Sequence, residues 1–311
     1  MILILFLGYG ILLLWVFDFY ELNYNENIQD NSNLSLCIII DHITNVKKLI
    51  KTIDSIQHIN SKQNIQLILI NHSNDDINFI ITSYISLFKD INIFKVDNYD
   101  FDKNIINSNN ILIIKNGVEL SPGFIDTITK HMYYIDIDII FFCKYNGAIN
   151  KKNIFIQLYD SFQESIKSSL INKNIYKKIN FKHDCFLVSK DFFIKGIDEP
   201  ENLIKANFKH TIQPNLYISG NQSDDWSDLF LLFYIPISII YLCCLIMFIS
   251  NPNLILLIAI IIKIVSELYV IYSYYNKLQI KFPKVEFLLY SVVIPFYILS
   301  EMFFIKRIFN K

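Results

Sequence analysis

Hydrophobic residues follow three different patterns along the chain. The first 17 residues are apolar apart from glycines, and Asp18 ends this run. In the middle of the chain, short apolar runs alternate with amphipathic stretches, and toward the C-terminus the apolar stretches become long. This order predicts an N-terminal membrane anchor at residues 1–18, an α/β domain at 34–227 and C-terminal membrane helices at 228–311.

The N-terminal apolar run is close to the shortest length that spans a bilayer, about 17 residues. It has no basic segment before it and no cleavage site of small residues, so a cleaved signal peptide is not expected. We interpret it as an uncleaved anchor, with a buried strand or helix as the alternative. The polar, asparagine-rich residues 21–33 are predicted to be a linker.

The middle segment has the pattern of alternating strands and helices. Residues 36–40 form an apolar run typical of a fully buried strand, and residues 45–57 carry apolar side chains at helical spacing. The same reasoning predicts strands at 65–70, 91–96, 111–114 and 137–142, and helices at 77–88 and 124–132.

Three apolar stretches near the C-terminus, residues 229–249, 254–272 and 287–305, each have about the length of a bilayer span. The lysine-bearing connection at 274–286 predicts that this loop, and by alternation the α/β domain, lies on the cytoplasmic face, as in a bacterial inner membrane. The basic residues of the C-terminal tail would then lie outside. The last stretch is therefore either a span that breaks this rule or an interfacial or re-entrant element.

Lys263 and Glu267 are the charged pair within the second of these stretches. They are four residues apart and thus on one helical face, where each can neutralise the other. We interpret them as a structural pair, with a functional intramembrane pair as the alternative.

Composition excludes some classes of function. The chain is 53% hydrophobic with a formal net charge of −1, so it lacks the basic surface of a nucleic-acid-binding protein. Its five cysteines show no metal-ligand spacing, which favours buried thiols in a reducing compartment over a disulfide framework.

Two predicted strands end in polar residues. The strand at 65–70 is followed by Asn71 and, four residues later, Asp75, and the strand at 111–114 is followed by Lys115 and Gly117. A strand-to-helix turn with Asp75 near a helix N-cap would account for the first of these in structural terms alone. Together the segments resemble family 2 glycosyltransferases. The resemblance implies a GT-A-like fold, that of a nucleotide-diphospho-sugar transferase.

The resemblance also implies roles for these residues. Asn71 and Asp75 would contact the nucleotide, and Lys115 and Gly117 stand where the family has an Asp-x-Asp that binds Mg²⁺ or Mn²⁺. A lysine cannot ligate a metal, so we assign no metal ligand and predict that Lys115 meets the diphosphate directly. Glu119 as a displaced ligand, and the literal Asp-x-Asp at 136–138, are the alternatives.

The sequence also differs from the family at the position of the general base. Its Glu-Asp pair corresponds to Glu201 and Asn202, and because Asn202 cannot accept a proton, Glu201 is the predicted base. Gln222 and Trp226 resemble the family's Gln-x-x-Arg-Trp motif at the acceptor side and membrane boundary, with Asp225 in place of the arginine. An interfacial tryptophan anchor is the alternative for Trp226.

The resemblance thus implies a membrane glycosyltransferase that moves a sugar from a nucleotide-sugar to a lipid-linked or polysaccharide acceptor. The departures at several motif positions indicate a diverged or catalytically impaired member. Two alternatives stay open: a non-catalytic membrane protein that keeps the fold as a scaffold or binding module, and a small transporter or assembly factor built on the last three apolar stretches.

Overall fold

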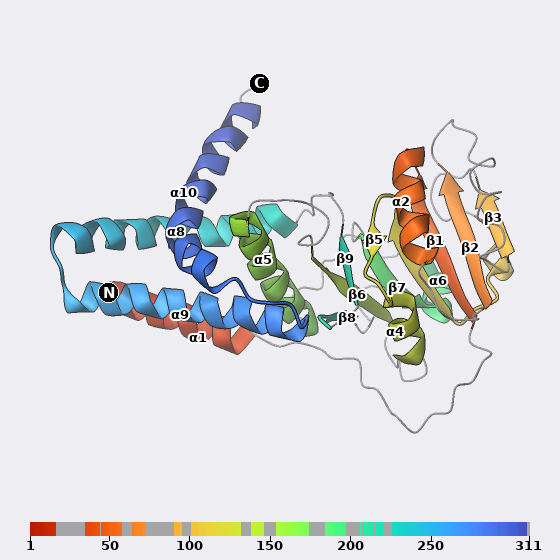
Figure 1. The fold of residues 1–311 in the computed structure, drawn as a ribbon, viewed down its shortest axis with the longest axis horizontal. Coiled ribbons are helices and arrows are strands. Elements are labelled where there is room, and N and C mark those ends of the chain that lie inside the picture. The colour runs from red at the N-terminus through yellow and green to blue at the C-terminus, as the bar shows by residue number, and fades with distance from the viewer. Residues whose placement is uncertain are drawn as a thin grey trace. The chain divides into compact units, whose positions relative to one another are not determined.

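The structure, a computed structural model of the 311-residue chain, divides into two compact units (Figure 1). The helical unit comprises Met1–Asp18, Tyr145–Lys173 and Ser223–Lys311, and the sheet unit comprises Phe19–Lys144 and Asn174–Gln222. The residues that the structure describes are 1–16, 35–43, 45–57, 64–71, 90–94, 101–131, 138–145, 154–173, 184–196, 206, 208–213, 216–219 and 226–309.

The sheet unit is a mixed α/β structure. Its described strands are β1 (Ser35–Ile43), β2 (Asn64–Asn71), β3 (Asp90–Phe94), β4 (Asn110–Lys115), β5 (Glu119–Leu120), β6 (Ile139–Lys144), β7 (Cys185–Ser189), β8 (Phe208–Thr211) and β9 (Tyr217–Ser219). Its described helices are α2 (Val46–Gln57), the short 3₁₀ helix η2 (Lys103–Ile105), α4 (Phe124–His131) and α6 (Lys190–Gly196). The predicted α/β class is confirmed for this unit.

The strand order places several strand ends at one edge of the sheet. The order is β3-β2-β1-β4-β7-β6-β9-β5, with β8 paired to β6. The first four strands are parallel, whereas β7 runs antiparallel to both β4 and β6. The carboxyl ends of β1, β2, β4 and β6 therefore share an edge with the amino end of β7.

The core of the sheet unit follows from continuous apolar runs. Leu36–Ile40 in β1 is buried on both faces, as expected for a central strand in a parallel sheet. Helix α2 covers the sheet with Leu49, Ile53 and Ile56, which recur at helical spacing and are all buried in the same hydrophobic cluster. The predicted strand at 36–40 and helix at 45–57 are both confirmed.

The helical unit is built from long helices. They are α1 (Ile2–Val16), α5 (Ile154–Asn172), α8 (Trp226–Ser250), α9 (Leu254–Lys277) and α10 (Lys284–Phe309). Helix α9 packs on α1, α5 and α8, and α10 packs on α5 and α8.

Helix α5 belongs to the helical unit, although the sequence analysis included its residues in the α/β domain. Its apolar residues Leu158 and Phe162 are buried, and the helix packs against α9 and α10. A local pattern of apolar residues does not reveal which partner buries them. The predicted division at residues 18, 34 and 227 stays a prediction.

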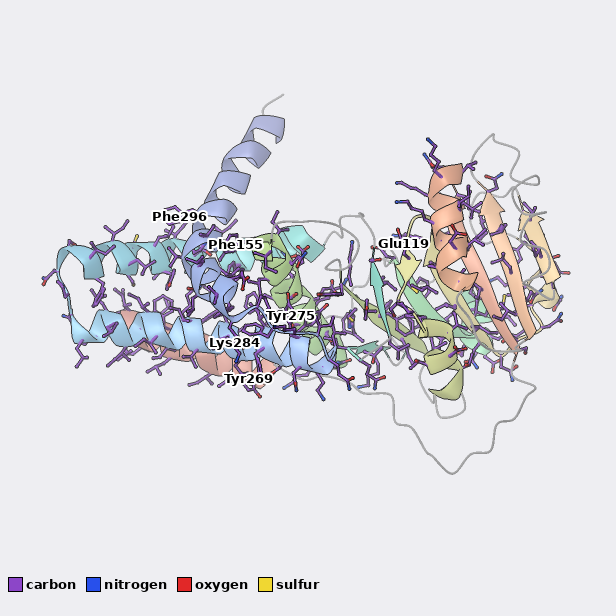
Figure 2. The ribbon with its side chains drawn as sticks, viewed as in Figure 1. Glu119, Phe155, Tyr269, Tyr275, Lys284 and Phe296 are labelled. Atoms are coloured by element: carbon purple, nitrogen blue, oxygen red, sulfur yellow. The ribbon has the colours of Figure 1, made fainter. Side chains whose placement is uncertain are left out.

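Within the part of the chain that the structure describes, one helix is long and apolar enough to cross a bilayer, namely α9. Two further apolar segments, Ile2–Leu14 and Tyr234–Ser250, are shorter. Large apolar side chains project outward from these helices and from α10, where Phe296 is 58% exposed (Figure 2).

Candidate functional site

Three charged side chains meet at the shared edge of the sheet. Lys115 ends β4, Lys144 ends β6, and Asp184 comes directly before β7, which lies between those two strands. The Asp184 carboxylate lies 3.9 Å from Lys115 Nζ through Oδ1 and 3.2 Å from Lys144 Nζ through Oδ2. The Lys115 backbone N–H also donates to the Asp184 carbonyl at 2.8 Å. We call these three residues the strand-end triad.

Burial of the triad is uneven. The Asp184 side chain is 3% exposed, whereas those of Lys115 and Lys144 are 14% and 15% exposed. A buried carboxylate needs a compensating charge, and here two ammonium groups supply it. The triad therefore carries one excess positive charge, and both ammonium groups sit where solvent still reaches the side chains.

More polar residues continue along the same edge. Asp41 of β1 pairs with Lys115 in the parallel register, and its carbonyl accepts a 2.9 Å hydrogen bond from the Asn116 N–H. The buried Asn116 side chain donates from Nδ2 to the Asn45 carbonyl at 3.2 Å. Asn71, at the end of β2, is also buried. The carboxyl edge of an open α/β sheet is where ligands commonly bind.

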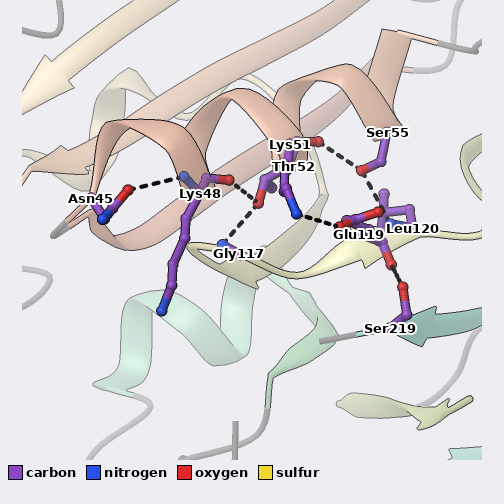
Figure 3. A network of polar contacts seen from close by, with 9 residues as sticks. All are labelled: Asn45, Lys48, Lys51, Thr52, Ser55, Gly117, Glu119, Leu120 and Ser219. Carbon is purple, nitrogen blue, oxygen red and sulfur yellow. Dashed lines mark hydrogen bonds and ion pairs between the residues drawn. The ribbon is translucent and has the colours of Figure 1, made fainter. Parts of the chain in front are cut away.

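The turn after Lys115 is fixed to helix α2 by side-chain hydrogen bonds (Figure 3). The Gly117 N–H donates to Thr52 Oγ1 at 2.9 Å, and the Leu120 N–H donates to Ser55 Oγ at 3.1 Å. Thr52 and Ser55 are three residues apart and therefore on one face of the helix. This face sets the path of the chain as it leaves β4.

Gly117 has a backbone conformation that requires glycine. Its φ is +95°, and a Cβ at this position would lie 3.1 Å from Cδ of Lys48, whose aliphatic stem runs along the turn. An L-residue here would be strained by its backbone and crowded by Lys48. The position where the resemblance implies the second acid of a metal-binding pair is thus a turn that an aspartate does not fit.

Among the residues that the structure describes, those at the ends of β4 and β6 do not fit a divalent cation. Lys115 brings an ammonium group, Gly117 brings no side chain, and the carboxylate of Asp184 is paired with two lysines. Among the described residues, no group of three or more histidines, cysteines, aspartates and glutamates lies close enough to hold a metal.

The two alternative metal ligands from the sequence lie elsewhere. Glu119 is on β5, 4.0 Å from Lys51 Nζ on α2, and its carbonyl accepts from Ser219 (Figure 3). Asp138 precedes β6, whereas Lys144 ends it, so Asp138 lies at the opposite edge of the sheet. Neither joins the triad.

Several predicted site residues lie outside the described part of the chain. These are Asp75, Glu201 and Gln222, together with Asn202, Asp225 and Asp136. Trp226 is the first residue of α8, and its side chain is not described. Of the predicted site, the structure describes Asn71 and Lys115 at the ends of β2 and β4, with β1 between them.

Sequence reasoning missed Lys144 and Asp184. Lys144 follows an apolar run, which is the same signal that singled out Lys115, whereas Asp184 precedes one. Their meeting depends on β7 entering the sheet antiparallel between β4 and β6. Spacing along the chain carries no record of that arrangement.

A second charged group is enclosed in the helical unit. Lys263 Nζ lies 2.9 Å from Glu267 Oε2, and both side chains are fully buried. Tyr9 of α1 and Tyr234 of α8 donate to Glu267 Oε1 at 3.0 and 2.5 Å. The Lys263 ammonium also lies 4.2 Å above the centre of the Tyr241 ring. The pairing expected from the sequence is confirmed, and it joins three helices.

Comparison with known proteins gives matches to solved structures only. No family model and no curated protein matches the sequence. A mannosyltransferase from Pyrobaculum calidifontis, solved with GDP-Man and Mn²⁺, is similar at 7% identity and a TM-score of 0.47, over 95% of this chain and 92% of that one. S. aureus TarS residues 1–349, solved with UDP-GlcNAc, is similar at 10% identity and a TM-score of 0.39, over 76% of this chain and 72% of that one. Likenesses at these values identify neither the reaction nor the substrate of this chain.

Proposed function

We propose that the sheet unit is a GT-A-like domain that binds a nucleotide-sugar at its polar edge and transfers the sugar to a lipid-linked or polysaccharide acceptor. The observation that carries the proposal is the position of Lys115. It ends a central parallel strand at the edge where α/β sheets bind ligands, and its backbone is held by Asp184 on one side and by the turn packed on α2 on the other.

Each polar residue has a role in this proposal. Asn71 and Asp75 bind the base or ribose, because amide and carboxylate oxygens accept hydrogen bonds from N–H and hydroxyl groups. Lys115 meets the diphosphate as a point charge. Glu201 is the general base, and Gln222 and Trp226 lie on the acceptor side at the membrane boundary.

The transfer itself is a displacement at the anomeric carbon of the sugar. The acceptor oxygen forms a bond to that carbon while the bond from the carbon to the diphosphate oxygen breaks, and the electron pair leaves with the nucleoside diphosphate. The acceptor proton passes to the Glu201 carboxylate. The Lys115 ammonium stabilises the charge that develops on the leaving diphosphate.

The helical unit supports a place in a membrane for the whole chain. Helix α9 has the length and composition of a span, and the outward apolar side chains of α1, α8 and α10 suit contact with lipid. The connection between α9 and α10 carries Lys277, Lys281 and Lys284, which favours the cytoplasmic face for this loop and, by alternation, for the sheet unit.

A binding module without turnover is the second candidate, and one residue favours it. Asn202 stands where the family has its base, and an amide accepts no proton at neutral pH. Binding and turnover therefore have to be measured separately.

The test is binding of UDP, GDP and their sugars to the full chain in detergent, with Mn²⁺ or with EDTA, beside Lys115→Ala. We expect binding that is unchanged by EDTA and lost in the variant. A transfer assay with the sugar nucleotide that binds then separates the enzyme from the binding module, since Glu201→Gln abolishes turnover in the first case only. Absence of binding by all four classes of ligand would rule the proposal out.

A further inference from the structure

We propose that Lys115 and Lys144 together form a metal-independent site for a diphosphate, and that Asp184 is the residue that positions both lysines. The inference rests on the proposed function in one respect, since it takes the diphosphate to be that of the nucleotide-sugar. The geometry of the strand-end triad and the charge of its surroundings carry the rest.

The position of Asp184 explains how two lysines can be held at one point. Lysine side chains are long and flexible, and an unrestrained lysine loses much conformational freedom when it is fixed on a ligand. The Asp184 carboxylate uses one oxygen for each ammonium group, at 3.9 and 3.2 Å. The two cations, from strands on either side of β7, are therefore already close together before any ligand arrives.

A backbone hydrogen bond aligns Lys115 with Asp184 at the sheet edge. The Lys115 N–H donates to the Asp184 carbonyl at 2.8 Å, which continues the antiparallel pairing of β4 with β7 by one residue. Asp184 is 3% exposed and its charge is turned inward, whereas the two lysines keep 14% and 15% of their side-chain surface. Solvent therefore reaches the two lysine side chains more than it reaches the carboxylate.

The charge of the edge favours an anion. Besides the triad, the edge includes Asp41, aligned with Lys115, and Lys48, whose stem lies against Gly117. Among the described residues of this edge, three ammonium groups and two carboxylates leave one excess positive charge. A diphosphate offers two groups of acceptor oxygens, which matches two neighbouring ammonium donors.

The absence of a fit for metal points the same way. In a transferase that uses Mg²⁺ or Mn²⁺, the ion neutralises the leaving diphosphate. At this edge Gly117 cannot be replaced by an acid without strain, and the Asp184 carboxylate is engaged by two lysines. Two ammonium groups supply the same neutralisation without an ion.

The test uses the full chain in detergent with inorganic pyrophosphate, UDP and GDP as probes, each with Mn²⁺ and with EDTA. The variants are Lys144→Gln, Lys144→Arg and Asp184→Asn, with Lys51→Gln as the matched control. Lys51 is an exposed lysine of the same unit, paired with Glu119 and not with the triad. Thermal unfolding of each variant checks that it is folded.

We expect pyrophosphate and one nucleotide to bind to the wild type and to weaken by about tenfold or more in Lys144→Gln, the loss of one charged hydrogen bond. Lys144→Arg retains most of the affinity, and Lys51→Gln retains all of it. Asp184→Asn keeps both lysines but loses their tether, so it weakens binding less than Lys144→Gln and increases its dependence on salt.

The outcomes separate the inference from the proposed function. Nucleotide binding that is unchanged in folded Lys144→Gln would overturn the two-lysine site and leave the proposed function standing. Lysine-dependent binding of pyrophosphate without binding of UDP or GDP would support the anion site and overturn its assignment to a nucleotide-sugar. No binding of any probe, or binding that EDTA abolishes, would overturn the inference.

Discussion

Two of the groups in which a lysine meets a carboxylate, one in each unit, differ in burial and in charge balance. In the helical unit, Glu267 is fully buried and its two oxygens are occupied by Lys263, Tyr9 and Tyr234. In the sheet unit, Asp184 faces two lysines that both keep some exposure. The first group is balanced and closed, which suits holding helices together. The second has more cation than it needs for its own stability, which suits a ligand.

The largest expected effect on stability comes from removing one charge of the buried Lys263–Glu267 pair. Glu267→Leu leaves the Lys263 ammonium buried without its carboxylate, and we expect the free energy of unfolding of the full chain to fall by about 3–5 kcal/mol. Chemical denaturation in detergent measures it. The double variant Lys263→Leu/Glu267→Leu removes both charges and should be more stable than the single one. If the two variants were equally unstable, burial of charge would not be the reason.

The next largest effect concerns the turn at Gly117, beside the strand-end triad. Gly117→Asp introduces the acid that the family resemblance implies, and we expect a loss of about 2–3 kcal/mol from strain and crowding, with no gain of Mn²⁺ binding. Gly123→Asp is the control, because Gly123 also has a positive φ but has no atom within 4 Å of its missing Cβ. Denaturation curves and Mn²⁺ titration check both. Tight Mn²⁺ binding by Gly117→Asp would contradict the account of this edge.

A smaller effect is expected where α2 holds that turn. Thr52→Val removes the hydroxyl that accepts from the Gly117 N–H and leaves this partly buried donor unpaired, at about 1–2 kcal/mol of stability. Because the turn begins at Lys115, pyrophosphate binding should weaken as well, although Thr52 touches no ligand. Thr52→Ser keeps the hydroxyl and should behave like the wild type in both measurements.

Substitutions in the strand-end triad itself should lower the stability of the chain least. Lys144→Gln leaves Asp184 paired with Lys115, so we expect a loss of about 1 kcal/mol or less in unfolding, against a large loss in anion binding. Calorimetric unfolding beside the binding titration measures the two effects. If Lys144→Gln destabilised the chain as strongly as Glu267→Leu, the distinction between a closed and an open group would fail.

A last prediction uses the cysteine next to Asp184 as a reporter. Burial, and to a lesser degree the Asp184 charge, raises the pKa of the Cys185 thiol, and burial raises that of Cys37 to about 12. The thiolate form appears only as the pH approaches these raised values, so at pH 8 neither thiol should react with a maleimide in the native chain. Asp184→Asn should leave Cys185 protected. Rapid labelling in that variant would show that Asp184 also closes the edge over the core.

The elements were predictable where the signal is local. Continuous isoleucine and leucine runs gave strands at 36–40 and 111–114 that the structure confirms as parts of β1 and β4, and the spacing of apolar residues gave α2. The helical nature of α8, α9 and α10 followed in the same way from long apolar stretches.

The candidate site was predictable only in part. Lys115 and Asn71 could be found because each ends an apolar run, and the predicted helix at 77–88, like Asp75 and Glu201, falls outside the described residues. Lys144 and Asp184 could not be assigned, because their contact depends on strand order and direction rather than on spacing. For the same reason, the sequence did not reveal that α5 packs with the C-terminal helices.

The stem of Lys48 against Gly117 also limits how this chain can change over generations. A metal site built from acids at 115 and 117 would also need a relaxed turn and more room beside Lys48, whose Cδ lies 3.1 Å from the place of a Cβ at 117. A single substitution at 117 meets strain without yet gaining an ion, and a single substitution at 115 removes a cation that nothing yet replaces. We therefore expect each first step to be a loss, and the effects of substitutions at 48, 115 and 117 to depend on one another.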